Sequence, residues 1–509
     1  MNKLIIPIIV ILIIAAGIGG FFIFQTPAFP EPSLSQKPKE EISKDSPFGA
    51  HGAFSRPFVE SDKVSYEEIL RRSHEVKKPY KHVQDIGIRW VRPNSDIYWS
   101  VVQPTLEHRK NGIFNWTVYD MLHGRVPSGV NILGTIDARP WGSNDPTFKP
   151  YTWDFADEEM ERYYIKFVQE TVERYDGNGI KDMPGLKNPI KYWQVSNEPA
   201  LRPLVERWED VETVQENLKK NLDPQGFSRL VELTYKAIKE KNPEAKIALA
   251  GMAGGYGFVS KDPLTFREVH EFYLPILKNL SGKYIDIFDI HYYGVEWKGM
   301  KDAYDFFRRA LDKNGYQNTE IWFTETGVPS SPVGERFQAI NLIKRYIYPL
   351  SFGVKKIFWW NMIEGEYPLE VDNPSNHFGL VYDGIGKDDP GYGVRKLAYY
   401  AYKKMVEVLD GSDWNNIQTI QEKDGIYVYK FTKNNKPIYV AWNDNTAEKT
   451  ITISGITSNQ VKITEAVPKY ESGKEVSDYN TAFNTETKSV FGGKITLTLK
   501  DKPVFVEEK

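Results

Sequence analysis

Short apolar runs alternate with longer segments of helical periodicity between residues 47 and 408 of this chain. The runs are rich in β-branched and aromatic residues, a composition typical of buried strands. The segments between them, such as 157–175 and 225–242, carry apolar residues at spacings of three and four, which predicts amphipathic helices. The predicted strands lie within residues 48–54, 88–94, 131–140, 191–199, 246–252, 285–294, 320–327 and 355–364.

Alternation of strands and helices predicts parallel strands joined by crossover helices. Eight such units over residues 47–408 predict an α/β fold, a (β/α)8 TIM barrel with long loops. A doubly wound open sheet is the alternative fold. No glycine-rich nucleotide fingerprint follows the first predicted strand. We interpret the glycine-rich stretch 251–257 as a loop, because no helix opens at its end and it lacks a P-loop lysine.

After residue 408 the pattern changes to short runs of nearly alternating polarity separated by turn residues. This pattern predicts a C-terminal all-β sandwich over residues 409–509, which we expect to brace the barrel rather than to bind glycan. Its predicted strands lie within residues 424–432, 436–444, 449–456, 460–467 and 494–508.

The N-terminal residues 1–24 predict a transmembrane segment. From Leu4 to Phe24 the chain is an uncharged apolar run of 21 residues, long enough to cross a bilayer as a helix. Lys3 precedes the run, so we expect a single-pass membrane protein with its remaining domains outside the cell. A cleaved signal peptide with its site at Thr26–Ala28 is the alternative, which would give a secreted protein. Residues 25–46 are rich in proline, serine and charge and predict a flexible tether.

The composition limits the classes of partner and cofactor that the protein can be expected to bind. The net charge of -3 argues against a nucleic-acid partner, and aromatic residues make up 14% of the chain, which favours stacking on sugar rings. The absence of cysteine excludes disulfides and thiolate chemistry. The 8 histidines show no metal-ligand spacing, so we expect no catalytic metal and no cofactor.

Two glutamates end predicted strands that face each other across a barrel. Glu198 ends the fourth strand and Glu325 ends the seventh, and the chemistry of such barrels lies at the carboxyl ends of the strands. Two carboxylates about 5–5.5 Å apart constitute a retaining glycosidase. We therefore predict Glu198 as acid/base and Glu325 as nucleophile. Glu364 and Glu366 are rival acids that we interpret as solvated loop residues.

The motifs Asn-Glu-Pro at 197–199 and Thr-Glu-Thr-Gly at 324–327, each on its expected strand, resemble those of clan A glycoside hydrolases, with families 5 and 39 the most similar. The resemblance covers residues 47–408. It implies that the site is completed by residues on other strands. These are Arg92 beside the nucleophile, His291 and Tyr293 on the sixth strand, and Trp360 as a floor for the sugar.

Asn197 can hydrogen-bond the 2-hydroxyl of the sugar. In family 39 a tryptophan tends to follow the nucleophile, and this chain has Thr326 there, so the family assignment stays open.

The sequence thus predicts an enzyme that cleaves β-O-glycosidic bonds of an extracellular oligo- or polysaccharide by double displacement. Its predicted partners are the carbohydrate substrate and, through the N-terminal segment, the membrane. A transglycosylase that uses the same two glutamates is one alternative. The other is an inactive surface protein that binds carbohydrate on the same fold.

Overall fold

The structure is a computed structural model, which describes residues 45–52, 78–93, 96–138, 153, 155, 157–200, 222–255, 263–365, 374–385 and 389–509. Within the described part of the chain, no helix combines the length and apolar character needed to cross a bilayer. The predicted transmembrane segment at residues 1–24 and residues 25–44 of the predicted tether lie outside the described residues.

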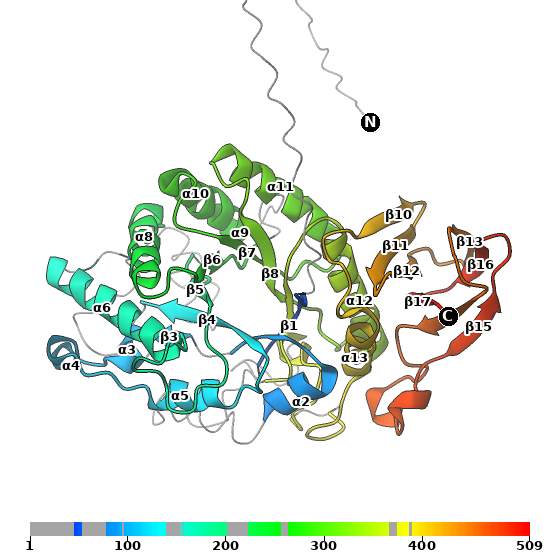
Figure 1. The fold of residues 1–509 in the computed structure, drawn as a ribbon, viewed down its shortest axis with the longest axis horizontal. Coiled ribbons are helices and arrows are strands. Elements are labelled where there is room, and N and C mark those ends of the chain that lie inside the picture. Colours follow the sequence, from blue (N-terminus) through cyan, green and yellow to red (C-terminus); the bar gives the residue numbers. More distant parts are fainter. Residues whose placement is uncertain are drawn as a thin grey trace, which may run out of the picture. The chain divides into compact units, whose positions relative to one another are not determined.

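Eight parallel strands close into a barrel, as predicted (Figure 1). Each strand pairs with its sequential neighbour, and β1 pairs with both β2 and β9, so that the sheet has no edge. A short strand, β3 (Ile97–Tyr98), adds a further pairing to β4. The barrel strands are β1 (Phe48–His51), β2 (Trp90–Arg92), β4 (Asn131–Asp137), β5 (Tyr192–Asn197), β6 (Lys246–Gly251), β7 (Ile287–Tyr292), β8 (Glu320–Thr326) and β9 (Ile357–Trp359).

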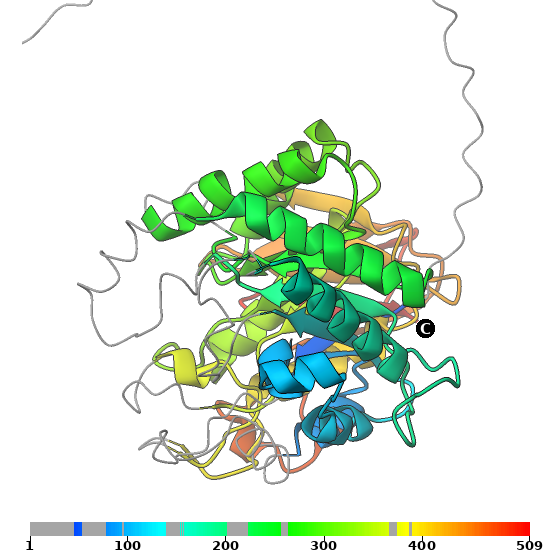
Figure 2. The same cartoon turned by 90° about the vertical axis from the view of Figure 1, so that its left-hand side faces the viewer.

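Helices cover the outside of the barrel, and Figure 2 shows α6 and α8 running side by side. Asp157 and Asp223 begin these two helices by accepting the backbone N–H of a residue in the first turn, which places both starts where the sequence predicts them. Among the described residues of the barrel region, the helices are α2 (Pro79–Ile86), α3 (Trp99–Val102), α4 (Leu106–Asn111), α5 (Thr117–Gly124), α6 (Glu158–Tyr175), α8 (Pro224–Lys241), α9 (Pro263–Arg267), the π-helix η2 (Glu268–Tyr273), α10 (Leu274–Leu280), α11 (Gly299–Lys313), α12 (Glu335–Ser351), the 3-10 helix η3 (Pro374–His377) and α13 (Leu397–Leu409).

The inside of the barrel is apolar at the start of the strands, and in several strands it is polar two residues further on. The apolar layer contains Trp90, Leu133, Tyr192, Ala248, Ile287, Trp322 and Phe358. Because side chains alternate along a strand, residues two positions later point the same way. In β2, β7 and β8 those positions hold Arg92, Asp289 and Thr324, which are all buried. The barrel therefore has an aromatic floor under a buried polar layer.

A bulge in β8 interrupts this alternation. Asp289 pairs with Trp322 and His291 pairs with Glu325, so β8 advances three residues while β7 advances two. The pairing of β8 with β9 shifts over the same residues. A bulge re-aims the side chains that follow it, and here it brings Glu325 level with His291 at the barrel mouth.

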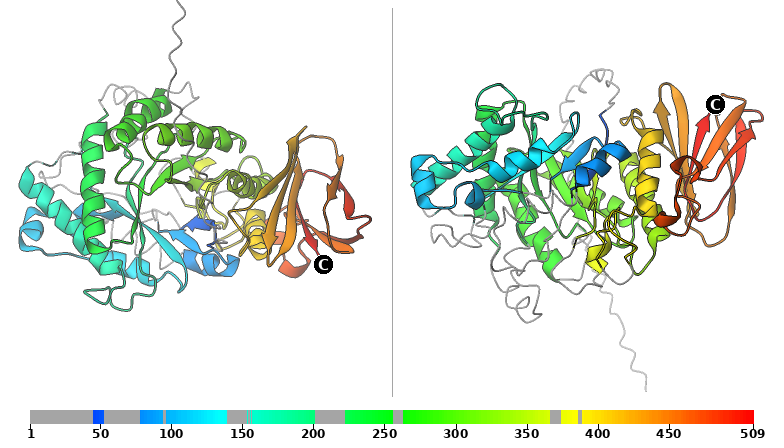
Figure 3. Two further views of the ribbon diagram at one scale, coloured as in Figure 1. Left: turned by 45° about the horizontal axis from the view of Figure 1, so that its top comes forward. Right: turned by 90° about the horizontal axis from the view of Figure 1, so that it is seen from below.

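The C-terminal region forms antiparallel sheets, as predicted (Figure 3). A six-stranded sheet has the order β10-β11-β12-β17-β14-β15, and β13 and β16 form a second sheet that shares an apolar core with it. The strands are β10 (Gln418–Lys423), β11 (Ile426–Lys433), β12 (Lys436–Asn443), β13 (Lys449–Ser454), β14 (Gln460–Glu465), β15 (Thr485–Ser489), β16 (Lys494–Leu499) and β17 (Val504–Glu508). The 3-10 helices η4 (Gly473–Glu475) and η5 (Tyr479–Thr481) lie between β14 and β15. The domain boundary predicted at residues 408 and 409 falls at the end of α13.

The C-terminal sheet contacts the barrel through aromatic rings and ion pairs. Trp297, which follows β7, lies 5.5 Å from the Trp442 ring of β12, centroid to centroid. Beside this contact, Asp444 accepts hydrogen bonds from Lys344 of α12, at 2.5 Å, and pairs with Lys298, at 2.6 Å. Burial raises the pKa of Asp444, but the hydrogen bonds from both lysines outweigh it and leave the pKa below its usual value.

The ion cluster at Asp444 generates a stability prediction. Asp444→Asn keeps the shape of the side chain and leaves the nearly buried ammonium of Lys344 without its counter-charge. We expect this change to lower the free energy of unfolding by about 2 kcal/mol. Asp305→Asn is the matched control, because Asp305 pairs with Lys301 at the surface and should cost less than about 1 kcal/mol. Urea unfolding of both variants measures the difference, and equal losses would contradict the prediction.

Candidate active site

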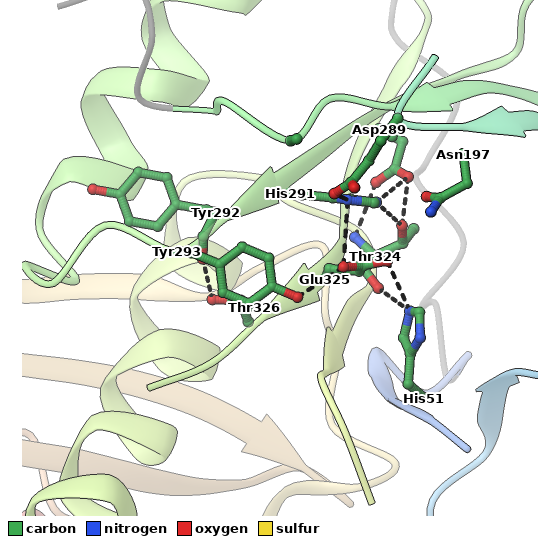
Figure 4. A network of polar contacts seen from close by, with 12 residues as sticks. His51, Asn197, Asp289, His291, Tyr292, Tyr293, Thr324, Glu325 and Thr326 are labelled. Carbon is green, nitrogen blue, oxygen red and sulfur yellow. Dashed lines mark hydrogen bonds and ion pairs between the residues drawn. The ribbon is translucent and has the colours of Figure 1, made fainter. Parts of the chain in front are cut away.

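The carboxylate of Glu325 is buried at the mouth of the barrel and is held by groups from other strands. Arg92 Nη1 donates to its Oε1 at 2.8 Å, and the hydroxyl of Tyr293 donates to its Oε2 at 2.7 Å. Figure 4 shows the phenol of Tyr293 pointing at this carboxylate. His291 Nδ1 lies 3.5 Å from Oε2. These contacts replace the water that a buried carboxylate loses.

The second predicted acid, Glu198, meets the first through a histidine. Its Oε1 lies 2.7 Å from Nδ1 of His291, so that one imidazole nitrogen faces both carboxylates. Oxygens of Glu198 and Glu325 and a nitrogen of His291 all lie within 4.8 Å of one another. The structure therefore brings the two predicted acids together across the barrel mouth.

Burial and charge shift the pKa values of these groups in opposite directions. Burial raises the pKa of Glu325 above its usual value, although the charges of His291 and Arg92 act to lower it. Burial alone would lower the pKa of His291. The carboxylates of Glu325, Asp289 and Glu198 outweigh this and raise the pKa of His291 to about 10. The surrounding acids thus favour the imidazolium form of His291.

The end of β5 places two of the predicted residues. Asn197 Oδ1 accepts a hydrogen bond from Arg92 Nη2 at 2.6 Å. Ser196 and Glu198 both have positive φ, at 64° and 46°, in the left-handed region that non-glycine residues rarely adopt. The turn lets the Glu198 N–H donate to the Gly251 carbonyl at 3.1 Å while its carboxylate reaches His291. Strain of this kind concentrates at functional sites.

Trp360 lies directly after β9, and its ring is 6.1 Å from that of Tyr293, nearly perpendicular to it. Trp359 is fully buried, and its Nε1 donates to the Phe378 carbonyl at 2.9 Å. Trp359 therefore belongs to the core, while Trp360, the predicted floor for the sugar, lies next to a residue that contacts Glu325.

Sequence reasoning missed several residues of the site. His51 at the end of β1 lies 3.6 Å from Glu325 Oε1 and contacts the Thr324 carbonyl at 2.9 Å. Asp289, two residues before His291 on β7, lies 3.4 Å from the Nε2 of His291 and accepts a hydrogen bond from Gln194 at 2.7 Å. His51 and Asp289 both lie inside predicted strands, within residues 48–54 and 285–294, so the position at a strand end that identified the two acids gives no signal for either.

Glu364 is not the solvated loop residue that the sequence suggested. It is buried, and its carboxylate contacts the ammonium of Lys396 and lies 3.3 Å from His377. The chain packs so closely here that a Cβ on Gly379 would lie 2.2 Å from the backbone nitrogen of Glu364. Glu364 is therefore committed to a buried ion pair, while Glu366 lies outside the described residues.

Two groups of side chains in the described residues have the spacing of metal ligands. One is Glu198, His291 and Glu325, and the other is Glu364, Asp383 and Asp389. In each, positive charge already meets a carboxylate, from Arg92 in the first and from Lys396 in the second. These donor sets fit ion-pair networks better than a cation site.

The fold is shared with solved glycoside hydrolases. No protein-family model and no curated protein matches this chain. A family 39 glycoside hydrolase from the gut symbiont Bacteroides cellulosilyticus WH2 superposes with a TM-score of 0.57 and 17% identity, over 91% of this chain and 81% of that one.

A monomeric beta-xylosidase from Caulobacter crescentus CB15 gives a TM-score of 0.54 and 13% identity, over 91% and 95% of the two chains. A glucosidase from Croceicoccus marinus gives 0.53 and 14%, over 90% and 95%. At these identities the comparisons establish the fold, and the resemblance to family 39 is confirmed at that level.

The charge state of His291 can be tested by NMR of the imidazole nitrogens. With a pKa near 10, His291 should remain an imidazolium between about pH 6 and pH 8. Its folded pKa exceeds the ordinary 6.5, so its contribution to stability is complete below pH 6.5 and is lost as the pH rises through 10.

His123 is the internal control for this measurement, because burial lowers its pKa to about 4 and it should stay neutral over the same range. Glu325→Gln should lower the pKa of His291 by removing a carboxylate. A His291 signal that titrates near 6.5 in the wild-type protein would contradict the assignment.

Proposed function

We propose that this protein is a retaining glycoside hydrolase that cleaves β-O-glycosidic bonds, with Glu198 as acid/base and Glu325 as nucleophile. The observation that carries the proposal is the spacing of the two carboxylates, which have oxygens within 4.8 Å of each other. Retaining enzymes hold their carboxyl groups about 5–5.5 Å apart, whereas inverting enzymes need about 6.5–9.5 Å to admit a water. The spacing supports double displacement.

The environments of the two acids support different roles. Arg92 and Tyr293 hydrogen-bond Glu325 and favour its ionised form, which a nucleophile needs. Glu198 is more exposed, with 23% of its side chain accessible against 9% for Glu325. Its Oε1 shares a short contact of 2.7 Å with Nδ1 of His291. A leaving group at the mouth would meet Glu198 first.

The reaction proceeds in two displacements. A Glu325 oxygen attacks the anomeric carbon, the glycosidic C–O bond breaks, and Glu198 gives its proton to the leaving oxygen. The product is a covalent glycosyl-enzyme. Glu198, now a carboxylate, takes a proton from water as the water oxygen attacks the anomeric carbon and releases Glu325. Transfer to a sugar hydroxyl instead of water would follow the same steps.

The first substrates to test are aryl β-xylosides and β-glucosides, because two proteins with the same fold are a beta-xylosidase and a glucosidase. The oxygen of Asn197 accepts from Arg92, so its NH2 group is the end that a sugar 2-hydroxyl would meet. Trp360, packed against Tyr293, offers a ring on which the sugar can rest.

We further propose that the barrel works outside the cell and is anchored by residues 1–24. The apolar run Leu4–Phe24 and the preceding Lys3 support this placement. A polymeric substrate outside the cell would be within reach of a barrel on a tether.

Replacing each glutamate by alanine and adding azide as an external nucleophile tests the acid/base role of Glu198 and the nucleophile role of Glu325. Glu198→Ala should hydrolyse poor leaving groups most slowly, and azide should restore turnover of activated aryl glycosides as the β-glycosyl azide. Glu325→Ala should lose at least about 1,000-fold in rate, and azide should give the α-glycosyl azide. NMR of the first-formed product distinguishes the anomers.

Glu320→Gln is the control for these variants, because Glu320 lies on the same strand as Glu325 at the opposite end of the barrel. It should retain wild-type activity. A mechanism-based 2-fluoroglycoside should label the wild-type enzyme on Glu325. An inverted sugar product, or a label on another carboxylate, would overturn the proposed mechanism.

Fractionation of the native cells tests the location. We expect the protein in the membrane fraction, released by detergent and digested by protease added outside intact cells. Sequencing of its amino terminus should find the apolar run. A soluble mature form that begins near Phe29 would instead identify a cleaved signal peptide.

A further inference from the structure

A segment far from both acids in the sequence forms one wall beside the nucleophile. Residues 377–379, here called the anchored segment, follow β9 and have their backbone carbonyls bonded by side chains of the barrel. Gln338 Nε2 lies 3.1 Å from the Val328 carbonyl and 3.2, 3.3 and 3.4 Å from the three carbonyls of the anchored segment, so its two N–H groups are shared among them. Lys396 donates to the first carbonyl of the segment at 3.2 Å and Trp359 to the second at 2.9 Å. Gln338 and Lys396 are fully buried, so these bonds are shielded from water.

The anchored segment carries Phe378, which contacts the surroundings of the nucleophile on three sides. Its ring lies 5.5 Å from that of Tyr293 at 87° and 5.5 Å from that of Trp360 at 65°. A methyl group on Gly327, two residues after Glu325, would lie 2.7 Å from the Phe378 ring. The absence of a side chain at position 327 is therefore what admits this ring.

We propose that Phe378 is a positioning residue for Tyr293, holding the phenol so that its hydroxyl stays on Glu325 Oε2. The Tyr293 ring is packed edge-on by Phe378 and, at 6.1 Å, by Trp360. Edge-on aromatic pairs prefer a narrow range of orientations. Removing one of the two rings gives the phenol room to rotate and admits water that competes for its hydroxyl. The inference rests on the proposed function, because it assigns Phe378 a part in readying Glu325 for attack.

The backbone of the anchored segment makes the contact rigid. A phenylalanine on a mobile loop would follow Tyr293 rather than fix it, but here carbonyls on both sides of Phe378 are bonded to buried donors. The ring itself is half-buried. Replacement of Gln338 by leucine, which removes the donor and keeps the volume, should act in the same direction as a loss of the ring.

A double-mutant cycle on an aryl β-glycoside tests the proposal. Phe378→Ala should lower kcat by about 10-fold with a smaller change in KM. Phe378→Ala and Tyr293→Phe should both shift the acidic limb of the kcat/KM profile to higher pH, because the Tyr293 hydroxyl lowers the pKa of Glu325. In the Tyr293→Phe background, Phe378→Ala should cost less than about 2-fold, since the contact it supports is already gone.

Phe352→Ala is the matched control. Phe352 is also half-buried between two rings, those of Tyr304 and Tyr348, but it follows the C-terminal end of α12, whereas Gln338, which contacts the anchored segment, lies near the N-terminal end. It should leave the pH profile unchanged. Phe378→Leu keeps most of the volume and replaces the alanine variant if that one does not fold.

The positioning role would be overturned if the Phe378 and Tyr293 substitutions lowered kcat independently of each other and Phe378→Ala left the acidic limb of the kcat/KM profile unchanged. A wild-type enzyme that turns over no glycoside would instead reject the proposed function.

Discussion

Burial of the Glu325 carboxylate is the constraint on which the barrel mouth depends. A carboxylate removed from water loses several kcal/mol of solvation unless charges and hydrogen bonds replace it. Arg92, His291 and Tyr293 supply that replacement from β2 and from the end of β7. Because these residues are distant in the chain, the carboxylate is stabilised only when the parallel strands have closed into a barrel. The same closure brings Glu198 to the imidazole nitrogen of His291 that also faces Glu325.

Within the barrel, the residues that pack the apolar floor and the residues that form the polar site lie at successive inward-facing positions of the same strands. Trp90 and Trp322 lie in the aromatic floor, and two residues further on the same strands carry Arg92 and Thr324. The floor excludes water from below, and the charged contacts above it are stronger in the resulting low dielectric. The β8 bulge then re-aims Glu325 to the level of His291. A strand without this bulge would keep the alternation and turn that carboxylate away from the mouth.

Prediction from sequence succeeded where burial leaves a periodic pattern. All eight barrel strands were predicted because each is buried on both faces. In the C-terminal sheet, β10 and β15 were missed. They are the two edges of the six-stranded sheet, and their residues are mostly exposed, so neither shows an apolar alternation. Polar edge strands limit pairing with other chains, and this removes the signal that identifies a strand.

The order of strands and helices, and the positions of Glu198 and Glu325 at strand ends, can be predicted from the sequence, because they follow from periodicity and from the chain direction of a parallel barrel. The contacts between side chains depend on the complete fold, which brings His291 to both acids and places Phe378 against Tyr293. The reason is physical: a single histidine or phenylalanine leaves no periodic trace in a sequence, and its contacts depend on bulges and loops that the whole fold fixes.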